Sequence, residues 1–326
     1  MKAPAPLILL STYNGEKWIN EVLESLKQQS LKNWTLLVRD DGSKDKTVDI
    51  LKNFSKNDSR LILVEDALGN LGPTQSFSKL LELSLSYPQE HVFFCDQDDI
   101  WLSHKLESLS KTLNEYEFTL GRETPILLHS QLKTIDDKGH TLNVSYHNQM
   151  NFDPEVSQEK LSHLLVQNFV VGCSSAINKS LAKIASPIPR HALMHDWWCA
   201  LIACTLGKIV FVDEALTLYR VHSGNASGAG KKNRILDFFK KPQKYFELID
   251  QRITQAKELS QRLQSRTIDN KNPKIFYLNT FIKTLEDKSL NAFFKSRNLG
   301  LQMQGLDRSL FFYVTLLLRS LRSNKN

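Results

Sequence analysis

The sequence lacks both glycine-rich loops that most often hold phosphate groups at a helix N-terminus. Neither the G-x-G-x-x-G fingerprint of dinucleotide-binding enzymes nor the P-loop G-x-x-x-x-G-K occurs in the 326 residues. Where such a loop would follow the first apolar run, Leu7–Ser11, the chain reads Thr-Tyr-Asn-Gly. These two classes of phosphate-binding protein are therefore excluded, and any phosphate group would have to be bound through a metal ion.

Cysteine is scarce, and long hydrophobic runs are missing. The four cysteines form no C-x-x-C pair and have no histidine partners at zinc-finger spacing, so buried free thiols in a reducing compartment are expected. No apolar stretch reaches the roughly 20 residues that a membrane-spanning helix requires. The N-terminus shows no signal-peptide hydrophobic region. Together these absences predict a cytoplasmic protein.

The net charge of +7 is unevenly divided along the chain. Residues 1–230 contain 22 Lys and Arg against 27 Asp and Glu, whereas residues 231–326 contain 20 against 8. The two parts thus carry net charges of −5 and +12. This asymmetry predicts that the C-terminal part faces an anionic surface, either a membrane or nucleic acid. No nucleic-acid-binding module or aromatic ladder accompanies the basic residues, which disfavours nucleic acid.

Short apolar runs alternate with helical patterns through the first 116 residues. Such alternation predicts an α/β fold whose parallel strands are joined by right-handed crossovers. In open sheets of this kind the ligand binds beyond the carboxyl ends of the strands. The expected strands are 7–11, 34–38, 61–64 and 92–95, and the expected helices are 18–29, 45–54, 74–85 and 101–116.

The rest of the chain divides into a mixed segment and a helical one. The mixed segment predicts strands at 125–129, 168–178, 208–212 and 216–221, a hairpin around Asp137-Lys138-Gly139 and a helix from Met194. After the small, polar loop 224–230, helical periodicity predicts helices over 235–263, 273–298 and 306–321. We therefore expect an α/β domain at residues 1–228 and a basic helical region at 229–326.

Polar side chains follow all four N-terminal strands where each strand ends. Thr12 and Asn14 follow the first strand, Asp40 and Asp41 the second, and Asn70 the third; Asp96, Asp98 and Asp99 follow the fourth. These groups should converge on one crevice. Three neighbouring carboxylates repel one another unless a positive charge lies among them, and a divalent cation with oxygen ligands would provide it. The alternative is an acidic turn in which Asp99 caps the helix beginning at Trp101.

Six short motifs, taken in order, resemble those of family 2 glycosyltransferases of the GT-A fold. They are Ser-Thr-Tyr-Asn-Gly, Arg-Asp-Asp-Gly-Ser-Lys-Asp, Gly-Asn-Leu-Gly, Asp-Gln-Asp-Asp-Ile-Trp, His-Asp-Trp-Trp and Tyr-Arg-Val-His-Ser-Gly-Asn. The last two are similar to the bacterial rhamnosyltransferase-like branch. The resemblance covers roughly residues 5–225. It implies a mostly parallel central sheet flanked by helices, to which the C-terminal helices would form an appendage.

The resemblance implies roles for the residues at the strand ends. It places a nucleotide-sugar donor beside Thr12, Tyr13, Asn14, Glu16, Asp40, Asp41 and Asn70. The two aspartates would accept hydrogen bonds from the base N–H and the ribose hydroxyls, since ionised carboxylates only accept. For Asp41-Gly42-Ser43, an ordinary turn that caps a helix is the alternative.

The carboxylate motif would hold the metal and part of the donor. Asp96 and Asp98 would form the D-x-D pair, with Asp98 the direct ligand of Mg²⁺ or Mn²⁺ and Asp96 shared with the donor. Asp99 would assist or only cap a helix. His222 would close over the diphosphate or the metal, although a structural histidine after a strand is the alternative. Arg220 would pair with a phosphate or with an internal acid such as Asp213.

The resemblance also implies a general base for the attacking hydroxyl. An inverting transfer needs a proton acceptor on the face opposite the leaving group, and Asp196 would fill that role. His195 is the alternative base, because a neutral imidazole could take the same proton. Trp197 and Trp198 would stack on sugar faces. The plainer interpretation of this motif is a helix N-cap beside core tryptophans.

The implied activity is metal-dependent, inverting transfer of a sugar to a hydroxyl of a growing polysaccharide or lipid-linked glycan. L-Rhamnose from dTDP-L-rhamnose is the favoured donor group, and a UDP-sugar is the other. The segment Leu310–Arg319 would anchor the protein peripherally on the inner face of the cell membrane. A packed helical appendage with a solvated basic face is the alternative. A sugar-phosphate nucleotidyltransferase and an inactive membrane scaffold remain open as other functions.

Overall fold

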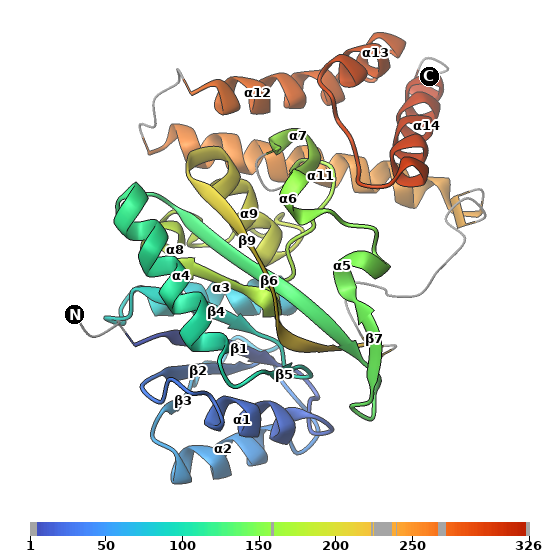
Figure 1. The fold of residues 1–326 in the computed structure, drawn as a ribbon. Coiled ribbons are helices and arrows are strands. Elements are labelled where there is room, and N and C mark those ends of the chain that lie inside the picture. The colour runs from blue at the N-terminus through green and yellow to red at the C-terminus, as the bar shows by residue number, and fades with distance from the viewer. Residues whose placement is uncertain are drawn as a thin grey trace.

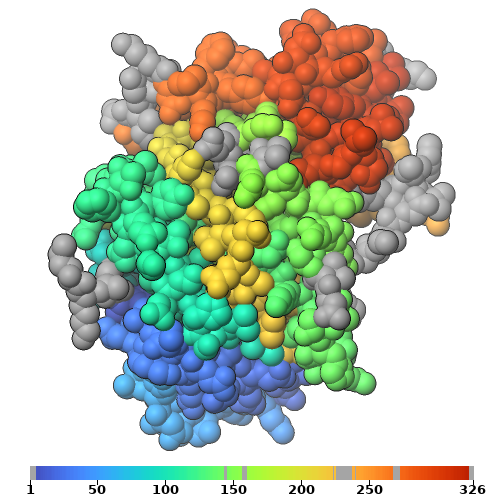
Figure 2. All heavy atoms as spheres, in the orientation of Figure 1, coloured from blue at the N-terminus to red at the C-terminus, as the bar shows by residue number. Residues whose placement is uncertain are grey.

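A nine-stranded sheet crosses the molecule in the order β3-β2-β1-β4-β8-β6-β9-β5, with β7 added beside β6 (Figure 1). The computed structural model describes residues 5–157, 160–222, 224, 237–238, 240–266 and 272–323. Helices cover both faces of the sheet, and the last four helices gather at one end of the molecule (Figures 1 and 2). The expected α/β fold with a C-terminal helical appendage is confirmed.

The N-terminal half of the sheet is parallel, as the alternating pattern predicts. Strand β1 pairs in parallel with β2 and β4, and β2 with β3. The β1 side chains alternate between two cores: Leu7 and Leu9 pack on one face of the sheet, Ile8 and Leu10 on the other. The elements are β1 (Leu7–Thr12), α1 (Ile19–Lys27), β2 (Thr35–Asp40), α2 (Thr47–Asn57), β3 (Leu61–Leu63), α3 (Pro73–Ser84) and β4 (His91–Cys95).

The second half of the sheet mixes both strand directions. Strand β8 runs antiparallel to β4 and β6, and β9 runs parallel to β6 but antiparallel to β5. The expected hairpin is confirmed as β6 and β7. The elements are β5 (Ile100–Trp101), α4 (Lys105–Leu120), β6 (Ile126–Ile135), β7 (Thr141–Ser145), α5 (Tyr146–Gln149), α6 (Pro154–Ser157), α7 (Leu161–Leu164), η1 (Gly172–Ser174), β8 (Ser175–Asn178), α8 (Lys179–Ala185), α9 (His195–Leu206) and β9 (Lys208–Arg220).

Three predicted boundaries in this half are wrong. The strands expected at 208–212 and 216–221 form one strand, β9, because a register irregularity opposite Gln131 accommodates the exposed Asp213 and Glu214. Only the last four residues of the expected strand 168–178 are β-structure, and a 3₁₀ turn precedes them. Helix α4 begins at Lys105 rather than Trp101, because Ile100 and Trp101 pair with β9.

The C-terminal helices share a hydrophobic core with the α/β part. They are α11 (Pro242–Gln264), α12 (Pro273–Glu286), α13 (Leu290–Asn298) and α14 (Leu306–Ser323), so the helix expected over 273–298 is two helices. Apolar residues of α11, α12 and α14 join one buried cluster with α9, whose side chains are buried on nearly every side. The predicted boundary at 228/229 lies outside the described residues and stays a prediction.

None of the described helices is both long enough and apolar enough to cross a membrane.

Candidate active site

A cavity of about 440 Å³ lies at the carboxyl ends of β1, β2 and β4. The sequence predicts that polar groups converge at this edge, and the structure brings many of them together. A larger hollow of about 520 Å³ along α4 contains none of the predicted site residues. The predicted residues that line the strand-end cavity are Thr12, Tyr13, Asp41, Asn70, Asp96, Asp98, His195 and Asp196.

Three other predicted residues shape the loops beside this cavity. The Asp40 carboxylate accepts hydrogen bonds from Thr12 and from the backbone and hydroxyl of Ser43. Asn14 accepts from the Lys44 backbone N–H, and Glu16 accepts from that of Lys46. Because backbone and hydroxyl donors already engage these oxygens, the side chains join the loops after β1 and β2 to each other. A direct contact with a nucleotide stays a prediction for all three.

Asp41 is buried, and it fixes the loop that carries Asn70. Its carboxylate accepts from the backbone N–H groups of Leu71 and Gly72, at 2.7 and 2.8 Å, and from Arg39 at 2.5 Å. The Asn70 amide donates to the Asp41 carbonyl at 3.0 Å. More than an ordinary turn therefore forms here, because the Asp41 side chain joins two strand-end loops at the wall of the cavity.

Arg39 was not predicted as a site residue, yet it holds this wall of the cavity in place from the protein interior. Its guanidinium is almost fully buried and pairs with Asp41 and Asp66, and it donates to Ser76 Oγ and the Gly69 carbonyl. The bonds from Arg39 lower the pKa of Asp66. One signal in the sequence could have pointed to it, because an arginine stands directly before the acid pair Asp40-Asp41.

Asp99 does not cap a helix, so the interpretation of the carboxylate motif as an acidic turn with Asp99 as the helix cap is wrong. The N-cap position of α4 is His104. Asp99 is instead fully buried, and its Oδ1 accepts from the Arg220 backbone N–H at 2.9 Å. Burial, and then the charge of Asp98, raise its pKa to about 7. Burial likewise raises the pKa of Asp96 well above its usual range, with Asp99, Asp98 and Asp196 adding repulsion.

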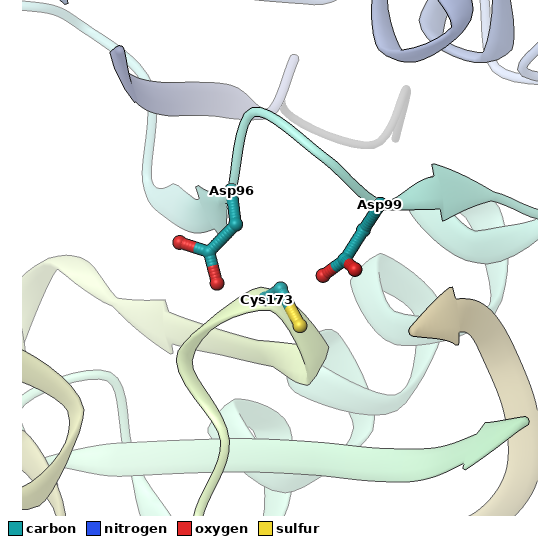
Figure 3. A group of neighbouring side chains, drawn as sticks. All are labelled: Asp96, Asp99 and Cys173. Carbon is teal, nitrogen blue, oxygen red and sulfur yellow. The ribbon is translucent and has the colours of Figure 1, made fainter. Parts of the chain in front are cut away.

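Asp96 and Asp99 project from the two ends of the β4–β5 loop toward Cys173 (Figure 3). One potential ligand atom from each lies within 4.8 Å of the others. Burial raises the pKa of the Cys173 thiol, so the sulfur stays protonated and is a poor ligand for a hard cation such as Mg²⁺. The buried Lys105 ammonium, also missed from sequence, donates to the Cys173 carbonyl and to Thr217 Oγ1. Asp96, Asp99, Cys173 and Lys105 thus form a buried polar group next to the cavity, which Asp96 also lines.

Two carboxylates of the same loop, those of Asp96 and Asp98, line the cavity, and His222 lies beside Asp98. Among the described residues, none donates a hydrogen bond to the Asp96 carboxylate. Asp98 Oδ2 lies 2.8 Å from His222 Nε2, and His222 Nδ1 accepts from the Gly224 N–H at 3.1 Å. Carboxylate oxygens and an imidazole nitrogen are donor types that bind Mg²⁺ or Mn²⁺, and a metal held by Asp96, Asp98 and His222 stays a prediction.

Arg220 supports the carboxylate loop rather than the cavity. Its guanidinium pairs with Glu21 at 2.8 Å and donates to the Asp98 carbonyl at 2.8 Å. The predicted internal partner Asp213 is therefore wrong. Asp213 lies on the exposed irregularity of β9, whereas the Arg220 side chain is fully buried at the end of that strand. Arg220 does not line the cavity, and a contact with phosphate remains a prediction.

Asp196 lies in the first turn of α9 and faces the cavity. Its carboxylate accepts from the Gly172 N–H at 2.8 Å, the Asn168 amide at 3.1 Å and the Trp197 N–H at 2.6 Å. Met194 is the N-cap residue, so the simple capping interpretation of Asp196 is wrong. Burial outweighs the three hydrogen bonds and raises its pKa to about 6. A carboxylate with this pKa is mostly ionised near neutrality and is a competent proton acceptor.

Gly172 is a third residue whose role was not predicted from the sequence. Besides donating to Asp196, it leaves no space for a side chain, because a Cβ there would lie 2.6 Å from His195 Nε2. The run of small residues around it predicts close packing against backbone or ligand, and the structure shows that its neighbours are the two candidate bases.

The other three residues of the His-Asp-Trp-Trp motif do not have the surroundings of Asp196. Trp197 and Trp198 are buried in the core, where their indole N–H groups donate to the carbonyls of Leu164 and Ala185. Their prediction as sugar-stacking residues is wrong, because both rings complete the packing of α9. His195 lines the cavity and stacks on Phe77 with ring centroids 4.0 Å apart. Burial lowers its pKa to about 3, which makes it a much weaker base than Asp196.

The chain is similar to several known proteins. Residues 7–122 match the model of Glycosyl transferase family 2. A dTDP-rhamnosyl transferase, RfbG of Shigella flexneri, is 25% identical over 229 residues, which cover 68% of this chain and 74% of RfbG. S. aureus TarS in complex with UDP-GlcNAc superposes with a TM-score of 0.57 at 16% identity, covering 90% of this chain and 79% of TarS.

A second solved structure extends the likeness over nearly the whole chain. The mannosyltransferase PcManGT of Pyrobaculum calidifontis, in complex with GDP-Man and Mn²⁺, covers 99% of this chain and 88% of its own. Its TM-score is 0.52 at 15% identity, so the similarity concerns the fold.

Proposed function

With a family 2 glycosyltransferase domain at residues 7–122, the chain is a glycosyltransferase of the GT-A fold, and we propose that it acts with inversion and a divalent metal. The proposed acceptor is a hydroxyl of a growing polysaccharide or lipid-linked glycan. The proposed donor is dTDP-L-rhamnose, with a UDP-sugar as the other candidate. The nucleotidyltransferase alternative is set aside, because the family match and the relatives are glycosyltransferases.

One observation carries the proposal: the donor-side acids and the candidate base face the same cavity. Asp96 and Asp98 line it from the end of β4, and Asp196 lines it from the start of α9. Asp196 is close enough to contribute to the raised pKa of Asp96. The cavity of about 440 Å³ falls within the range of small-molecule sites. This arrangement leaves room for a donor at one wall and an acceptor hydroxyl at the other.

In the proposed reaction, the acceptor oxygen bonds to the anomeric carbon of the donor sugar. The bond from that carbon to the diphosphate breaks, and its electron pair leaves with the nucleoside diphosphate. Asp196 takes the proton of the acceptor hydroxyl, which keeps the attacking oxygen nucleophilic as the new bond forms. The N–H groups of Gly172 and Trp197 and the Asn168 amide hold the carboxylate in place throughout.

The metal-binding residues would be Asp96, Asp98 and His222. A divalent cation bound there would offset the negative charge that builds on the departing diphosphate. The chain's own contribution is to position these ligands. Arg220 binds the Asp98 carbonyl and Asp99 accepts from the Arg220 backbone, while Gln97 bonds to the Tyr13 backbone in both directions. These contacts fix the loop that presents the ligands.

The donor is tested by turnover with purified protein and defined nucleotide sugars. Its support is the likeness to a dTDP-rhamnosyl transferase at 25% identity. We expect the rate of dTDP release from dTDP-L-rhamnose, by hydrolysis or transfer, to exceed the rate of UDP release from UDP-glucose or UDP-GlcNAc by about tenfold or more. Enzymes commonly discriminate by this factor between substrates that differ in one chemical group. Faster release of UDP than of dTDP would replace rhamnose with a UDP-sugar while leaving the glycosyl-transfer proposal intact.

Peripheral membrane binding is part of the proposal and is supported by one face of α14. Large apolar side chains recur there every three or four residues and remain exposed, at 87% for Leu306 and 67% for Leu310. Residues 231–326, which include this helix, carry the charge of +12. An exposed apolar stripe within a basic segment is typical of a helix that lies on an anionic membrane. The stripe is formed by Leu306, Leu310, Val314, Leu318 and Leu321.

Replacing two stripe residues together, Leu310→Glu and Val314→Glu, is expected to weaken binding to anionic vesicles by about a hundredfold. Each change removes roughly 1.5 kcal/mol or more of apolar burial at the membrane. Both positions are exposed, so the melting temperature should be nearly unchanged. Vesicle co-sedimentation measures the effect, with Phe276→Glu on α12 as control because Phe276 is also exposed. Equal binding by the double variant and the control would rule out α14 as the contact.

A further inference from the structure

A second cavity lies among the C-terminal helices, formed by residues other than those of the candidate active site. It has a volume of about 230 Å³ and lies between α11 and α14. Its walls are mostly apolar and aromatic, and two arginines reach it. The lining residues are Gln167, Tyr245, Leu248, Ile249, Arg252, Met303, Arg308, Phe311, Phe312 and Thr315.

Arg252 lines this cavity, and its side chain is partly rather than fully buried. Its Nε is buried and makes no hydrogen bond with any described residue. Burial alone lowers the pKa of Arg252 to about 10, since no acid in the described part of the chain lies near enough to oppose the effect. Its nearest characterised contact is the Phe312 ring, 5.9 Å from the guanidinium carbon.

The other arginines between these helices are satisfied. Arg319 of α14 pairs with Asp250 of α11 and donates to the Leu285 carbonyl. Arg308 donates to the Gln304 carbonyl at 3.1 Å. A guanidinium carries five N–H donors and cannot lose its charge under ordinary conditions, so it cannot avoid the cost of burial by deprotonation. The buried Nε–H of Arg252 has no acceptor among the described residues, and an anionic ligand in the cavity would supply one.

The residues that line this cavity indicate a ligand that is anionic at one end and apolar at the other. Oxyanions such as phosphate match the planar fork of an arginine. The other walls offer apolar surface, which does not favour a free, fully hydrated phosphate. They suit a phosphate group that carries an apolar chain. These walls are formed by Leu248, Ile249, Phe311 and Phe312. Phe311 and Phe312 belong to α14 and directly follow Leu310, a residue of its exposed stripe, so a molecule in a membrane facing that stripe would be close to the cavity.

We propose that this cavity binds an anionic phospholipid, with the phosphate group on Arg252 and the start of its apolar chain between α11 and α14. The site is independent of the proposed sugar transfer. It would hold one lipid in a defined position, whereas the α14 stripe contacts the membrane surface without selecting a headgroup.

The test uses the full chain and a water-soluble lipid, dihexanoyl phosphatidylglycerol, below its micellar concentration. Binding is measured by calorimetry for the wild type, Arg252→Gln and Lys257→Gln. The last is the control, because it removes one positive charge from an exposed position of the same helix, α11. We expect Arg252→Gln to bind the lipid on the order of ten to a hundred times more weakly, and Lys257→Gln to bind like the wild type. Equal affinities in all three proteins would overturn the proposal.

Two further measurements separate a lipid from other ligands. Phe311→Ala should weaken binding of the lipid while keeping Arg252 in place, and inorganic phosphate should bind the wild type far more weakly than the lipid does. Phosphate that binds as tightly as the lipid would assign the cavity to a free anion instead. Without ligand, Arg252→Gln should melt at the wild-type temperature or above it, because the substitution removes a buried Nε–H that has no acceptor among the described residues. A clear loss of stability in that variant would mean that Arg252 is structural.

Discussion

Asp98→Asn is expected to abolish metal-dependent binding of nucleoside diphosphate and to reduce sugar transfer by about a hundredfold or more. The substitution keeps the size of the side chain but removes the charge of the residue nearest to His222 in the candidate metal site. A bound divalent cation contributes several kcal/mol to charge stabilisation on a phosphoryl oxygen, and each 1.4 kcal/mol is a factor of ten. The asparagine amide also presents an N–H₂ group where one oxygen stood, which repels a cation.

The measurement is a thermal shift with dTDP or UDP, in Mn²⁺ and in EDTA. For the wild type, nucleotide at about a hundred times its dissociation constant should add about 2.7 kcal/mol to the free energy of unfolding, but only with the metal present. Asp98→Asn should show no such difference between Mn²⁺ and EDTA. Asp213→Asn, an identical change on the exposed part of β9, should behave like the wild type.

Two outcomes would contradict this prediction in different ways. Equal shifts of the wild type in Mn²⁺ and EDTA would refute the metal site itself. Unchanged nucleotide binding and unchanged glycan in cells carrying Asp98→Asn would favour the inactive membrane scaffold that the sequence leaves open.

The parallel half of the fold could be predicted because its signals are local. Strands buried on both faces need continuous apolar runs, and Leu7–Leu10 and Val92–Cys95 are runs of that kind. The cavity followed from topology, since polar residues after neighbouring parallel strands must meet at one edge. Asp96 and Asp98 were predicted at this edge for that reason, whereas Asp196, about a hundred residues later, was assigned from the resemblance to family 2 glycosyltransferases.

The errors concern features that depend on partners distant in sequence. Strand β9 continues through Asp213 and Glu214 because β6 pairs with it on both sides of the irregularity, which no local pattern in β9 shows. Trp197 and Trp198 follow the catalytic candidate directly, yet helical geometry turns both rings into the core. Arg39 and Lys105 were missed because a basic residue in sequence is usually exposed, and only the folded chain shows their buried partners.

Asp196→Asn is expected to reduce the rate of transfer by about a hundred to ten thousandfold while donor binding is retained. An asparagine keeps the shape of the side chain but cannot accept a proton from the acceptor hydroxyl, and general-base catalysis typically contributes a factor of this size. Donor binding should persist, because the candidate metal ligands lie on the other wall of the cavity. Rates of nucleotide release with acceptor present, and thermal shifts by the donor in Mn²⁺, measure the two properties separately. Retained turnover in Asp196→Asn, together with its loss in His195→Phe, would move the base to His195.

The pH dependence gives the same prediction a second readout. With a pKa of about 6, Asp196 should be protonated and inactive in mild acid, so wild-type kcat/KM should rise as the pH increases through 6 and level off near pH 8.

The folded-state pKa is raised above the usual 3.8, so the contribution of Asp196 to the free energy of unfolding is largest at low pH and declines as the pH rises through about 6. A shift of about two pKa units corresponds to about 3 kcal/mol. The free energy of unfolding of Asp196→Asn, relative to the wild type in EDTA, should therefore increase by up to about 3 kcal/mol between pH ~4 and pH ~8. A difference that stays constant over this range would show that Asp196 is not the buried carboxylate with a raised pKa that the proposed mechanism requires.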